Sequence, residues 1–579
     1  MSLNEFNRTF FDDNQRVSFI GDGELGGKAG SLKSFNDILS ETDFSKFKRI
    51  KVDIPTFTVI RTEIFDDFMQ QNNLFDIAYS DTEDDEIAIA FQNASLPFSV
   101  LGDLRELISK VDVPLAIRSS SMLEDAKYKP FAGIYGTKMI PNNQFDEDTR
   151  FTKMVEAIKY VYASTFFKEA KEYFTAAGLE IKNEKMAVII QEVIGNRYGD
   201  KFYPNLSGVG KSYNYYPIND SLPEDGVVNL AFGLGKTIVD GGMSWIYCPK
   251  CPNKKPPFGS INDMLKLTQT EFWSVNMGEP PEYDPTNETE YMVNENIHSA
   301  ENDNTLKNLV STFDHVNERL TIGTGKEGAR ILNFAPLLSL ELIPFNELIK
   351  EIMKVCEDKV DSAVEIEFAM TFSQDTTCEQ PYRFGLLQVR PMVVNDTDIT
   401  LNKEELLSED TIVASEHVLG NGVTENIHDI VYVKHENFDP MKTMKIADEI
   451  SQINSQLLKE KRPYLLIGYG RWGSSDPSLG IPVTWSKISG ASIIVEASLE
   501  NMNIEFSQGS HFFHNLTSFG IPYFYLPLRN NFPIKWEIIR SLQSIKELEF
   551  VSHVRSQDPL RTIVDGKSRS GVIKIGRKL

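Results

Sequence analysis

Apolar residues recur at two different spacings along the chain, and the spacing distinguishes helices from strands. Apolar positions three and four residues apart predict an amphipathic helix or helix pair over 151–182, ending near Gly178, and another helix over 440–462. A continuous apolar run predicts a buried strand over 186–194, with Gln191 inside the run. Because a polar side chain in a buried strand needs a partner, Gln191 either bonds backbone groups or faces a ligand.

Two more regions read as helical. Residues 63–110 are mainly helical, and the acidic run Asp81–Glu86 is expected to be a solvated connection within them. The segment 345–360 (FNELIKEIMKVCEDKV) also predicts a helix. Together with the predicted strands, these elements indicate an α/β (α+β) fold.

The segment 363–393 contains two alternating stretches, AVEIEFAM and RFGLLQVRPMV, which predict two strands. Glu365 and Glu367 are two residues apart in the first, and Gln388 and Arg390 are two apart in the second, so each pair shares one face of its strand. Two interpretations are open. The paired carboxylates hold a hard cation such as Mg²⁺ that shares its ligands with phosphates, or they face solvent and pair with arginine across the strands.

Glycine clusters precede lysines at three places in the chain. Residues 17–32 predict a short strand, a glycine-rich turn and the first turn of a helix that carries Lys28. Glycines let backbone amides approach an anion, and a helix N-terminus adds the positive end of its dipole. Lys211 and Lys236 follow similar clusters, GVGK and FGLGK, which suggests two more anion-binding turns. The alternative for Lys28 is a solvated lysine beside an ordinary glycine turn.

The stretch 115–137 (LAIRSSSMLEDAKYKPFAGIYGT) starts as a strand and ends in a glycine-bearing turn at Gly133. Between them lie Arg118, Ser119 with two further serines, and the acidic pair Glu124–Asp125. A guanidinium, hydroxyls and a flexible backbone form a plausible cradle for phosphoryl oxygens, because arginine binds them bidentately. The alternative is a polar loop after a buried strand.

Composition narrows the class of protein. The 579 residues include 83 acids and 59 bases, for a net charge of -24, which argues against a general nucleic-acid-binding role. Four cysteines are too few for a disulfide framework and indicate a reducing compartment. Because neither a leader-like start nor a membrane-length apolar run is found, we expect a cytoplasmic protein with no membrane partner. Cys248 and Cys251 form a lone CxxC, and without a second pair at ligand-like spacing a rigid loop is favoured over zinc.

Six motifs stand in one order along the chain: GGKAGSL, LAIRSSSMLEDAKYKPFAGIYGT, MAVIIQEVI, FGLGKTIVDGG, VEIEFAM and LLQVRPM. In order and spacing they resemble the nucleotide-binding domain of the phosphoenolpyruvate synthase and pyruvate phosphate dikinase family. The resemblance covers roughly residues 17–394 and implies an ATP-grasp-like, two-lobed fold. ATP and Mg²⁺ are the implied ligands.

The resemblance also implies roles for individual residues. Lys28 and Arg118 would bind ATP phosphates and stabilise the transferred group. Glu365 and Glu367 would hold Mg²⁺, although the family usually has aspartate where Glu365 stands. Further phosphate or nucleotide contacts are expected from Ser119, Gly133, Gln191, Gln388 and Arg390.

In this family the two terminal phosphates of ATP pass to a histidine of a separate domain. Residues 395–579 are too short for that domain plus a pyruvate-binding barrel, which takes about 250 residues. The family's phosphohistidine signature is not present as such, but EFSQGSHFFHNLTSFGIPYFYL (505–526) loosely echoes it around His511. His511 is therefore a candidate phosphoryl acceptor, and the alternative is a buried, hydrogen-bonded histidine. Arg471, in GYGRWGSSD, is read either as an oxyanion-binding turn or as a structural arginine packed on Trp472.

We therefore expect three parts: an N-terminal lobe over 1–110, the remainder of the nucleotide-binding region over 111–395, and a C-terminal α/β domain over 396–579. The sequence favours an ATP-dependent phosphotransferase of the dikinase type, with His511 or an unidentified molecule as acceptor. The alternative is a nucleotide-binding regulatory or scaffold module with little turnover, whose C-terminal domain recognises a protein partner.

Overall fold

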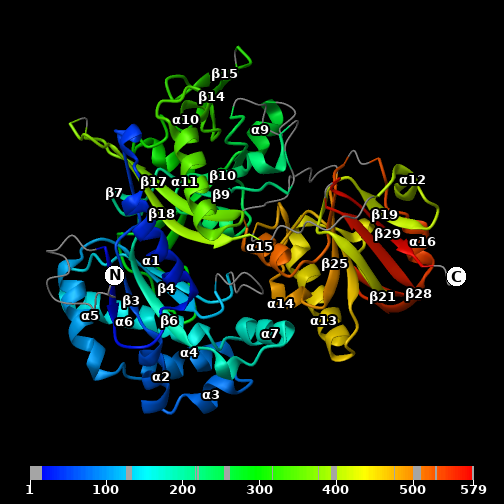
Figure 1. Ribbon diagram of the computed structural model, residues 1–579, viewed down its shortest axis with the longest axis horizontal. Coiled ribbons are helices and arrows are strands. Elements are labelled where there is room, and N and C mark those ends of the chain that lie inside the picture. Colours follow the sequence, from blue (N-terminus) through cyan, green and yellow to red (C-terminus); the bar gives the residue numbers. More distant parts are fainter. Residues whose placement is uncertain are drawn as a thin grey trace. The chain divides into compact units, whose positions relative to one another are not determined.

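The computed structural model of the chain describes residues 16–124, 133–215, 217, 221–252, 261–315, 317–375, 377–392, 401–474, 476–499, 510–528, 531–566 and 568–576. The chain forms two compact units (Figure 1). The first contains Met1–Ile238 and Met243–Met392, and the second contains Val239–Gly242 and Val393–Leu579. Both units combine helices with mixed sheets, so the α/β class predicted from the sequence is confirmed.

One sheet of the first unit carries the strands around Arg118. Its order is β1-β3-β6-β4-β5, with β1 and β3 parallel and the other neighbours antiparallel. The strands are β1 Val17–Ile20, β3 Phe57–Ile60, β4 Leu115–Ser121, β5 Thr137–Ile140 and β6 Met186–Glu192. We call this sheet A. The strand predicted at 186–194 is thereby confirmed, and it lies at the centre of the sheet, where a nearly unbroken apolar sequence is required.

A second sheet of the same unit, sheet B, carries the paired glutamates. Its order is β11-β10-β9-β17-β18-β2, and β17 and β18 are antiparallel neighbours. The strands are β2 Ile50–Asp53, β9 Leu206–Lys211, β10 Val227–Ala231, β11 Trp245–Tyr247, β17 Val364–Phe372 and β18 Tyr382–Pro391. The two alternating strands predicted within 363–393 are thereby confirmed.

Two smaller sheets complete the strands of the first unit. One has the order β13-β12-β8-β7 and the other β15-β14-β16. Their strands are β7 Asn196–Tyr198, β8 Lys201–Tyr203, β12 Glu271–Asn276, β13 Met292–Asn296, β14 Ser311–Asp314, β15 Arg319–Ile322 and β16 Ala329–Ile331.

Helices cover sheets A and B and bury their apolar faces. α6 packs on β4 and β5, with α4 and α5 against it, whereas α1 contacts β4, β6, β18 and β2 and so lies between the two sheets (Figure 1). α11 packs on β17 and β9. The helices are α1 Gly26–Glu41, α2 Thr62–Gln71, α3 Phe75–Tyr79, α4 Asp84–Asn93, α5 Phe98–Lys110, α6 Glu147–Ser164, α7 Lys168–Ala177, α8 Lys236–Val239, α9 Ile261–Leu267, α10 Ala335–Leu338 and α11 Phe345–Val360.

The predicted helices of the first unit are confirmed, with one correction. The helix pair predicted over 151–182 is α6 and α7, and α7 ends at Gly178, whose φ of 68° is the left-handed conformation that glycine adopts most easily. The acidic run Asp81–Glu86 is only partly a connection, because α4 begins at Asp84. Acidic side chains in a first helical turn are stabilised by the positive end of the helix dipole.

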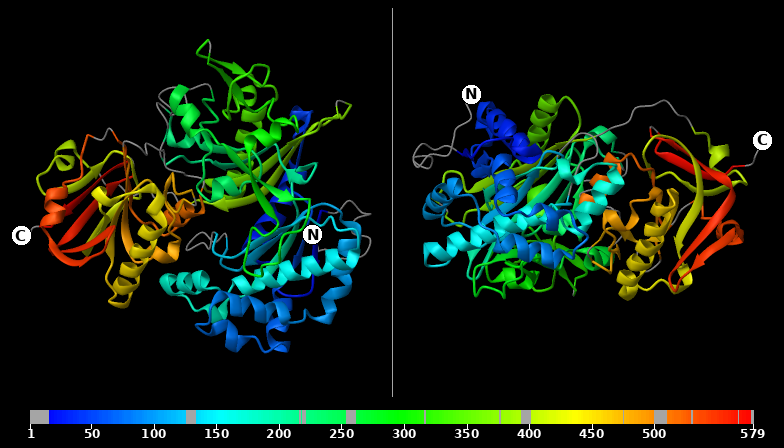
Figure 2. Two further views of the ribbon diagram at one scale, coloured as in Figure 1. Left: turned by 180° about the vertical axis from the view of Figure 1, so that it is seen from behind. Right: turned by 90° about the horizontal axis from the view of Figure 1, so that it is seen from below.

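The second unit is built on one large mixed sheet. Its order is β19-β29-β28-β21-β22-β25-β26-β20, and β27 pairs with β28. β21, β22, β25 and β26 are parallel neighbours, whereas the long strands β21 and β28 are antiparallel (Figure 2). The strands are β19 Thr411–Ser415, β20 Val418–Leu419, β21 Gly422–Val433, β22 Tyr464–Tyr469, β25 Ala491–Ala497, β26 Tyr523–Leu526, β27 Gln543–Glu547, β28 Val551–Asp565 and β29 Ser570–Ile575, with a separate pair β23 Arg471–Trp472 and β24 Gly480–Ile481.

The helices of the second unit include the one predicted over 440–462. It is α13, and its apolar stripe, which includes Ile446, Ile450 and Leu457, is buried. The helices are α12 Lys403–Leu406, α13 Thr443–Lys459, α14 Trp485–Ile488, α15 His511–Ser518 and α16 Trp536–Ser541. Short 3₁₀ helices in the two units are η1 Ser45–Phe47, η2 Ile181–Asn183, η3 Pro223–Asp225, η4 Ile297–Glu301, η5 His435–Asn437 and η6 Pro440–Lys442. Among the described residues, no helix is long and apolar enough to cross a bilayer.

Candidate functional site

The glycines before Lys28 let the start of α1 pack directly on the end of β4. A Cβ on Gly26 would lie 1.8 Å from the carbonyl oxygen of Ser120, and one on Gly27 would lie 1.7 Å from that of Glu124. Gly26 also has a positive φ of 75°. Glycine is therefore required here for close backbone approach. The hydroxyl of Ser120 stabilises this contact between α1 and β4, because it accepts a hydrogen bond from the Ala29 amide at 3.0 Å.

Lys28 is buried at this junction, with 6% of its surface exposed. Its ammonium lies 2.6 Å from Oε1 of Glu124 and 3.3 Å from Oγ of Ser119. Glu124 also accepts hydrogen bonds from the Ser119 hydroxyl and the Ser121 amide. The interpretation of Lys28 as a solvated lysine is wrong, because the end of β4 encloses the side chain and supplies its counter-ion.

Arg118 extends from sheet A to sheet B. Its Nη1 donates to Oε1 of Gln191 at 3.1 Å and to the carbonyl of Leu387 at 3.2 Å, and its Nη2 donates to Oε1 of Gln388 at 2.8 Å. The residue as a whole is partly buried. These contacts place the guanidinium where β4, β6 and β18 meet.

Gln191, which contacts Arg118, carries a hydrogen-bond donor that no described residue satisfies. Its Oε1 accepts from Arg118, but its Nε2 has no hydrogen-bond partner among the residues that the structure describes, although the side chain is only 2% exposed. A buried donor without a partner costs roughly 1–3 kcal/mol. Of the two alternatives in the sequence, these contacts favour the one in which Gln191 faces a ligand.

Glu365 and Glu367 lie on one face of β17 and both contact Arg390 of β18. The Arg390 guanidinium is 3.2 Å from Glu365 and 2.9 Å from Glu367, and Lys211 of β9 lies 3.0 Å from the second oxygen of Glu365. The registers Glu365↔Arg390 and Glu365↔Lys211 place these charges directly opposite one another. Cross-strand pairing is thus confirmed. The solvent-facing position is wrong, because Lys211, Glu365 and Arg390 are buried.

Lys211 was read from the sequence as part of an anion-binding turn, and that interpretation is wrong. The glycines before it lie inside the buried strand β9, where they make room for side chains of β17. A Cβ on Gly208 would lie 2.2 Å from the ring of Phe368. Burial lowers the pKa of the Lys211 ammonium, and the Glu365 carboxylate opposes this effect. Lys211 therefore forms a charged cluster with Glu365, Glu367 and Arg390, and it does so from a strand that the GVGK pattern did not reveal.

One hydrogen bond links the helix of Lys28 to the strand of Arg390. The hydroxyl of Ser31 in α1 donates to the carbonyl of Val389 at 2.9 Å, and Val389 lies between Gln388 and Arg390 in β18. This bond, the contact of Lys28 with Ser119 and the bond of Arg118 to Gln388 connect α1, β4 and β18 as one group of elements. Ser119 also donates to Glu124.

Gly133 is the one predicted nucleotide-binding residue with no contact to this group among the described residues. It is exposed and has a φ of 69°, in a turn before β5. The other residues expected to form the cradle, Asp125 and the Phe131–Ala132 pair, lie outside the described residues.

His511 is the first residue of α15 and belongs to the second unit. Beside it, the Ser510 hydroxyl accepts a hydrogen bond from the Phe513 amide at 3.2 Å, within the first turn of the helix. The residues of the predicted motif that precede Ser510, and the side chain of His514, lie outside the described part of the chain.

Arg471 has contacts that support the structural one of its two interpretations. It is buried, and its Nη1 donates to the backbone carbonyls of Gly241 at 3.0 Å and Gly242 at 3.2 Å. These acceptors belong to the same unit. A guanidinium that holds carbonyl oxygens stabilises a loop, so the structural interpretation is favoured, although the loop and not Trp472 supplies the hydrogen-bond acceptors.

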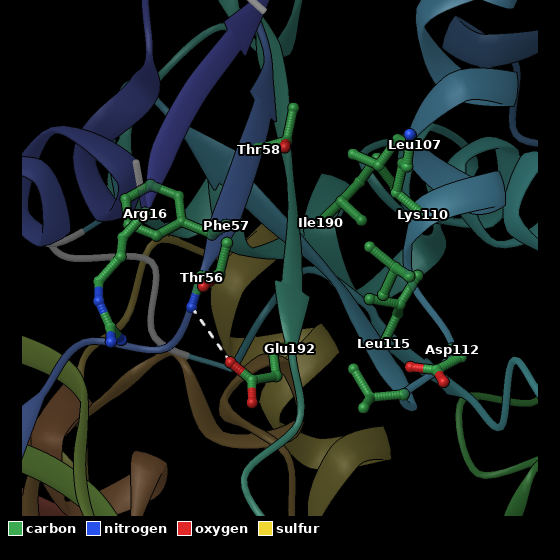
Figure 3. A pocket seen from close by; sticks show the side chains of 12 residues that line it. Arg16, Thr56, Phe57, Thr58, Leu107, Lys110, Asp112, Leu115, Ile190 and Glu192 are labelled. Carbon is green, nitrogen blue, oxygen red and sulfur yellow. Dashed lines mark hydrogen bonds between the residues drawn. The ribbon is translucent and has the colours of Figure 1, made fainter. Parts of the chain in front are cut away.

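A pocket of about 290 Å³ lies on the other face of sheet A. Thr58 and Ile190 line it, with Leu107 and Lys110 of α5 beside them (Figure 3). Side chains alternate between the faces of a strand, so Ile190 and its neighbour Gln191 point to opposite faces. The pocket is therefore separate from the contacts that Arg118 makes with Gln191 and Gln388.

Comparison with known families gives one match. The family of the pyruvate phosphate dikinase AMP/ATP-binding domain matches residues 23–411. The matched range begins in the glycine turn before α1 and includes every residue of the charged cluster.

Proposed function

Because this chain belongs to the pyruvate phosphate dikinase AMP/ATP-binding domain family, we propose that it is an ATP-dependent phosphotransferase of the dikinase type. The family domain binds ATP or AMP. The observation that carries the proposal is the contact of Arg118 with Gln191 in one sheet and with Gln388 in the other. It brings the Arg118 guanidinium to the junction of sheets A and B.

In the proposed site, Arg118 and Lys28 bind the phosphate oxygens of ATP. Arg118 offers the planar, multidentate donor set that phosphate favours, and Lys28 acts as a point charge. The Nε2 of Gln191 supplies a further donor that is already desolvated and lacks a partner among the described residues. Donors fixed in this way need little reorganisation when negative charge develops in the transition state.

The two carboxylates of β17, Glu365 and Glu367, differ in how available their oxygens are to Mg²⁺. Carboxylate oxygen is a ligand that Mg²⁺ prefers, and a site shared with phosphates needs only one or two of them. Both oxygens of Glu365 contact buried cations, Lys211 and Arg390, whereas Glu367 contacts Arg390 through Oε1. We therefore assign direct contact with Mg²⁺ to Glu367. Glu365 holds Lys211 and Arg390 in place. Bound Mg²⁺ would neutralise charge on the terminal phosphates.

The proposed reaction follows the two-step scheme that the family resemblance implies. A histidine nitrogen attacks the β-phosphorus of ATP, the bond from that phosphorus to the α–β bridging oxygen breaks, and AMP leaves with the electron pair. Water or phosphate then takes the γ-phosphoryl group, leaving one phosphoryl group on the histidine. His511 is the candidate nucleophile in this chain, and an acceptor outside the chain is the other possibility.

A nucleotide-binding regulatory module is the second candidate. It is favoured by the ion pair of Lys28 with Glu124, because an ammonium held by a buried carboxylate is less available to stabilise a phosphoryl group in transfer. A protein of this kind would bind ATP stoichiometrically and release little AMP.

The test is incubation of the full chain with Mg²⁺ and ATP labelled in the β-phosphate. A dikinase produces AMP together with an acid-labile, base-stable labelled protein. The His511→Asn variant should form no labelled protein, whereas His298→Asn should be labelled normally, because His298 is an exposed residue of the first unit. Label that persists in the His511 variant would place the acceptor elsewhere. ATP binding without AMP would overturn the dikinase proposal and leave the regulatory module.

A further inference from the structure

Three side chains with metal-binding atoms meet at one end of the β10–β11 hairpin. The carboxylate of Asp225 and the thiols of Cys248 and Cys251 place one ligand atom each within 4.8 Å of the others. Both cysteines are free thiols. We propose that Asp225, Cys248 and Cys251 bind a zinc ion. This site is independent of the nucleotide chemistry proposed above.

The strand register explains why an aspartate distant in sequence joins the CxxC. β10 and β11 are antiparallel, and Val228 pairs with Tyr247. Asp225 ends the short helix η3 just before β10 begins, and Cys248 directly follows β11, so both lie at the same end of the pair. The third ligand therefore comes from the short helix that precedes the neighbouring strand, which is why spacing along the sequence did not reveal it.

The CxxC is already folded into a turn suited to a metal-bound sulfur. The Cys251 amide donates to the Cys248 carbonyl at 3.0 Å, which closes a tight turn. The sulfur of Cys248 lies 3.8 Å from the backbone carbonyl oxygen of Asp225, so the turn brings this sulfur next to the residue that supplies the third ligand.

The dimensions of the cluster suit zinc. Zn–S bonds are about 2.3 Å long, so tetrahedral coordination separates ligand sulfurs by roughly 3.8 Å. The ligand atoms of the three residues lie within 4.8 Å of one another. To reach the tetrahedral separation, each atom therefore needs to move toward the metal by only a fraction of an ångström. Thiolate ligands select zinc over the harder Mg²⁺ and Ca²⁺.

The charge of the site is balanced by Lys250. Two thiolates and a carboxylate exceed the charge of Zn²⁺ by one negative unit. The Lys250 ammonium lies 3.0 Å from Oδ1 of Asp225 and donates to the Glu224 carbonyl at 3.0 Å. This arrangement orients the carboxylate from outside the ligand set, as the partners of metal ligands commonly do. Water completes the tetrahedron at the fourth position.

The first test is the metal content of the full chain purified without chelators or a metal-affinity tag. Mass spectrometry of the metals should find about one zinc per chain. The Cys248→Ser and Cys251→Ser variants should lose it. The matched controls Cys356→Ser and Cys378→Ser should keep it, because those thiols lie outside the cluster. Full zinc content in the Cys248→Ser variant would overturn the proposal.

A second test does not depend on how the cysteine variants fold. Unmodified protein stripped of metal and titrated with Co²⁺ should show sulfur-to-cobalt charge-transfer absorption and the strong visible bands of tetrahedral cobalt, and zinc should abolish both. Lys250→Gln should weaken zinc binding by about 10- to 100-fold, the usual effect of removing a partner of a metal ligand. The site would be excluded if the purified protein contained no zinc and the Co²⁺ titration gave no absorption bands. A disulfide between Cys248 and Cys251 in the purified protein would also exclude it.

Discussion

Nη2 of Arg118 lies 2.8 Å from Oε1 of Gln388, although 270 residues separate the two in the sequence. Arg118 belongs to sheet A and Gln388 to sheet B, so their hydrogen bond joins these two sheets. A second bond from Arg118, to the Leu387 carbonyl, has the same effect. A substitution at Arg118 should therefore affect both nucleotide binding and the fit of the sheets.

Arg118→Lys should weaken ATP binding by about 10-fold or more. Lysine keeps the charge but loses the planar fork that contacts Gln191 and Gln388 together, and hydrogen bonds to charged groups contribute roughly 1.5–3 kcal/mol. Calorimetric titration with a non-hydrolysable ATP analogue measures the change. Arg105→Lys is the control, since Arg105 is exposed and pairs only with the exposed Asp148 among the described acids. Equal affinities in the Arg118→Lys variant and the parent would contradict the proposed site.

Lys28→Ala should destabilise the first unit as well as abolish turnover. The substitution leaves the carboxylate of Glu124 buried without its cation, a change that costs roughly 3–5 kcal/mol. The double variant Lys28→Met/Glu124→Gln removes both charges, and it should recover most of the stability but none of the activity. Urea unfolding of the Lys28→Met, Glu124→Gln and Lys28→Met/Glu124→Gln variants tests this coupling. Independent, additive effects would show that the pair contributes nothing to the fold.

Glu367→Gln should raise the Mg²⁺ concentration needed for half-maximal AMP formation more than it changes ATP binding without metal. The amide keeps the shape of the side chain but loses the negative charge that Mg²⁺ requires. Glu357→Gln is the control, because Glu357 lies in α11 and not on β17. An unchanged Mg²⁺ dependence in the Glu367→Gln variant would remove Glu367 from the metal site.

Stability of the second unit should fall as the pH rises from about 4.5 to about 7. Burial raises the pKa of Glu496 from 4.5 to about 7, opposed by a hydrogen bond from Tyr523 and the charge of Arg471. The folded state thus holds a proton that the unfolded state releases. The stabilisation is complete below about pH 4.5 and is lost as the pH rises through 7.

The pKa shift corresponds to about 3 kcal/mol. Glu496→Gln should reduce this pH dependence, and calorimetric melting of the full chain at several pH values measures it. Glu184→Gln is the control for Glu496→Gln, because burial also raises the pKa of Glu184 to about 7 but Glu184 lies in the first unit. If the transition of the second unit varies with pH equally in the Glu496→Gln variant and the parent, the assignment to Glu496 fails.

Gly208→Ala should destabilise the protein by about 1–3 kcal/mol, because the new methyl group would overlap the ring of Phe368 in β17. Displacement of β17 should also weaken ATP binding, since Glu365 and Glu367 lie on that strand. Gly102→Ala in α5 is the control. No atom lies within 4 Å of its added Cβ, so it should stabilise the helix by roughly 0.5–1 kcal/mol. Equal stabilities for the two variants would contradict the packing described for β9.

The sequence alone determined the elements whose signals are local. Periodicity predicted α6 with α7, α11 and α13, a continuous apolar run predicted β6, and alternation predicted β17 and β18, because amphipathic helices and strands each leave a characteristic spacing. The order of the motifs identified the family, and alternation placed Glu365 and Glu367 on one face.

Only the tertiary structure decided which charges face one another. The sequence around Lys211 was typical of an anion-binding turn. In the structure the glycines before Lys211 lie inside β9, and its ammonium forms an ion pair with Glu365. The burial of Lys28 against Glu124 depends on how α1 sits on β4. Asp225 joins the CxxC only through the register of β10 and β11. These contacts join segments far apart in the sequence, and register and packing, which leave no local pattern, determine them.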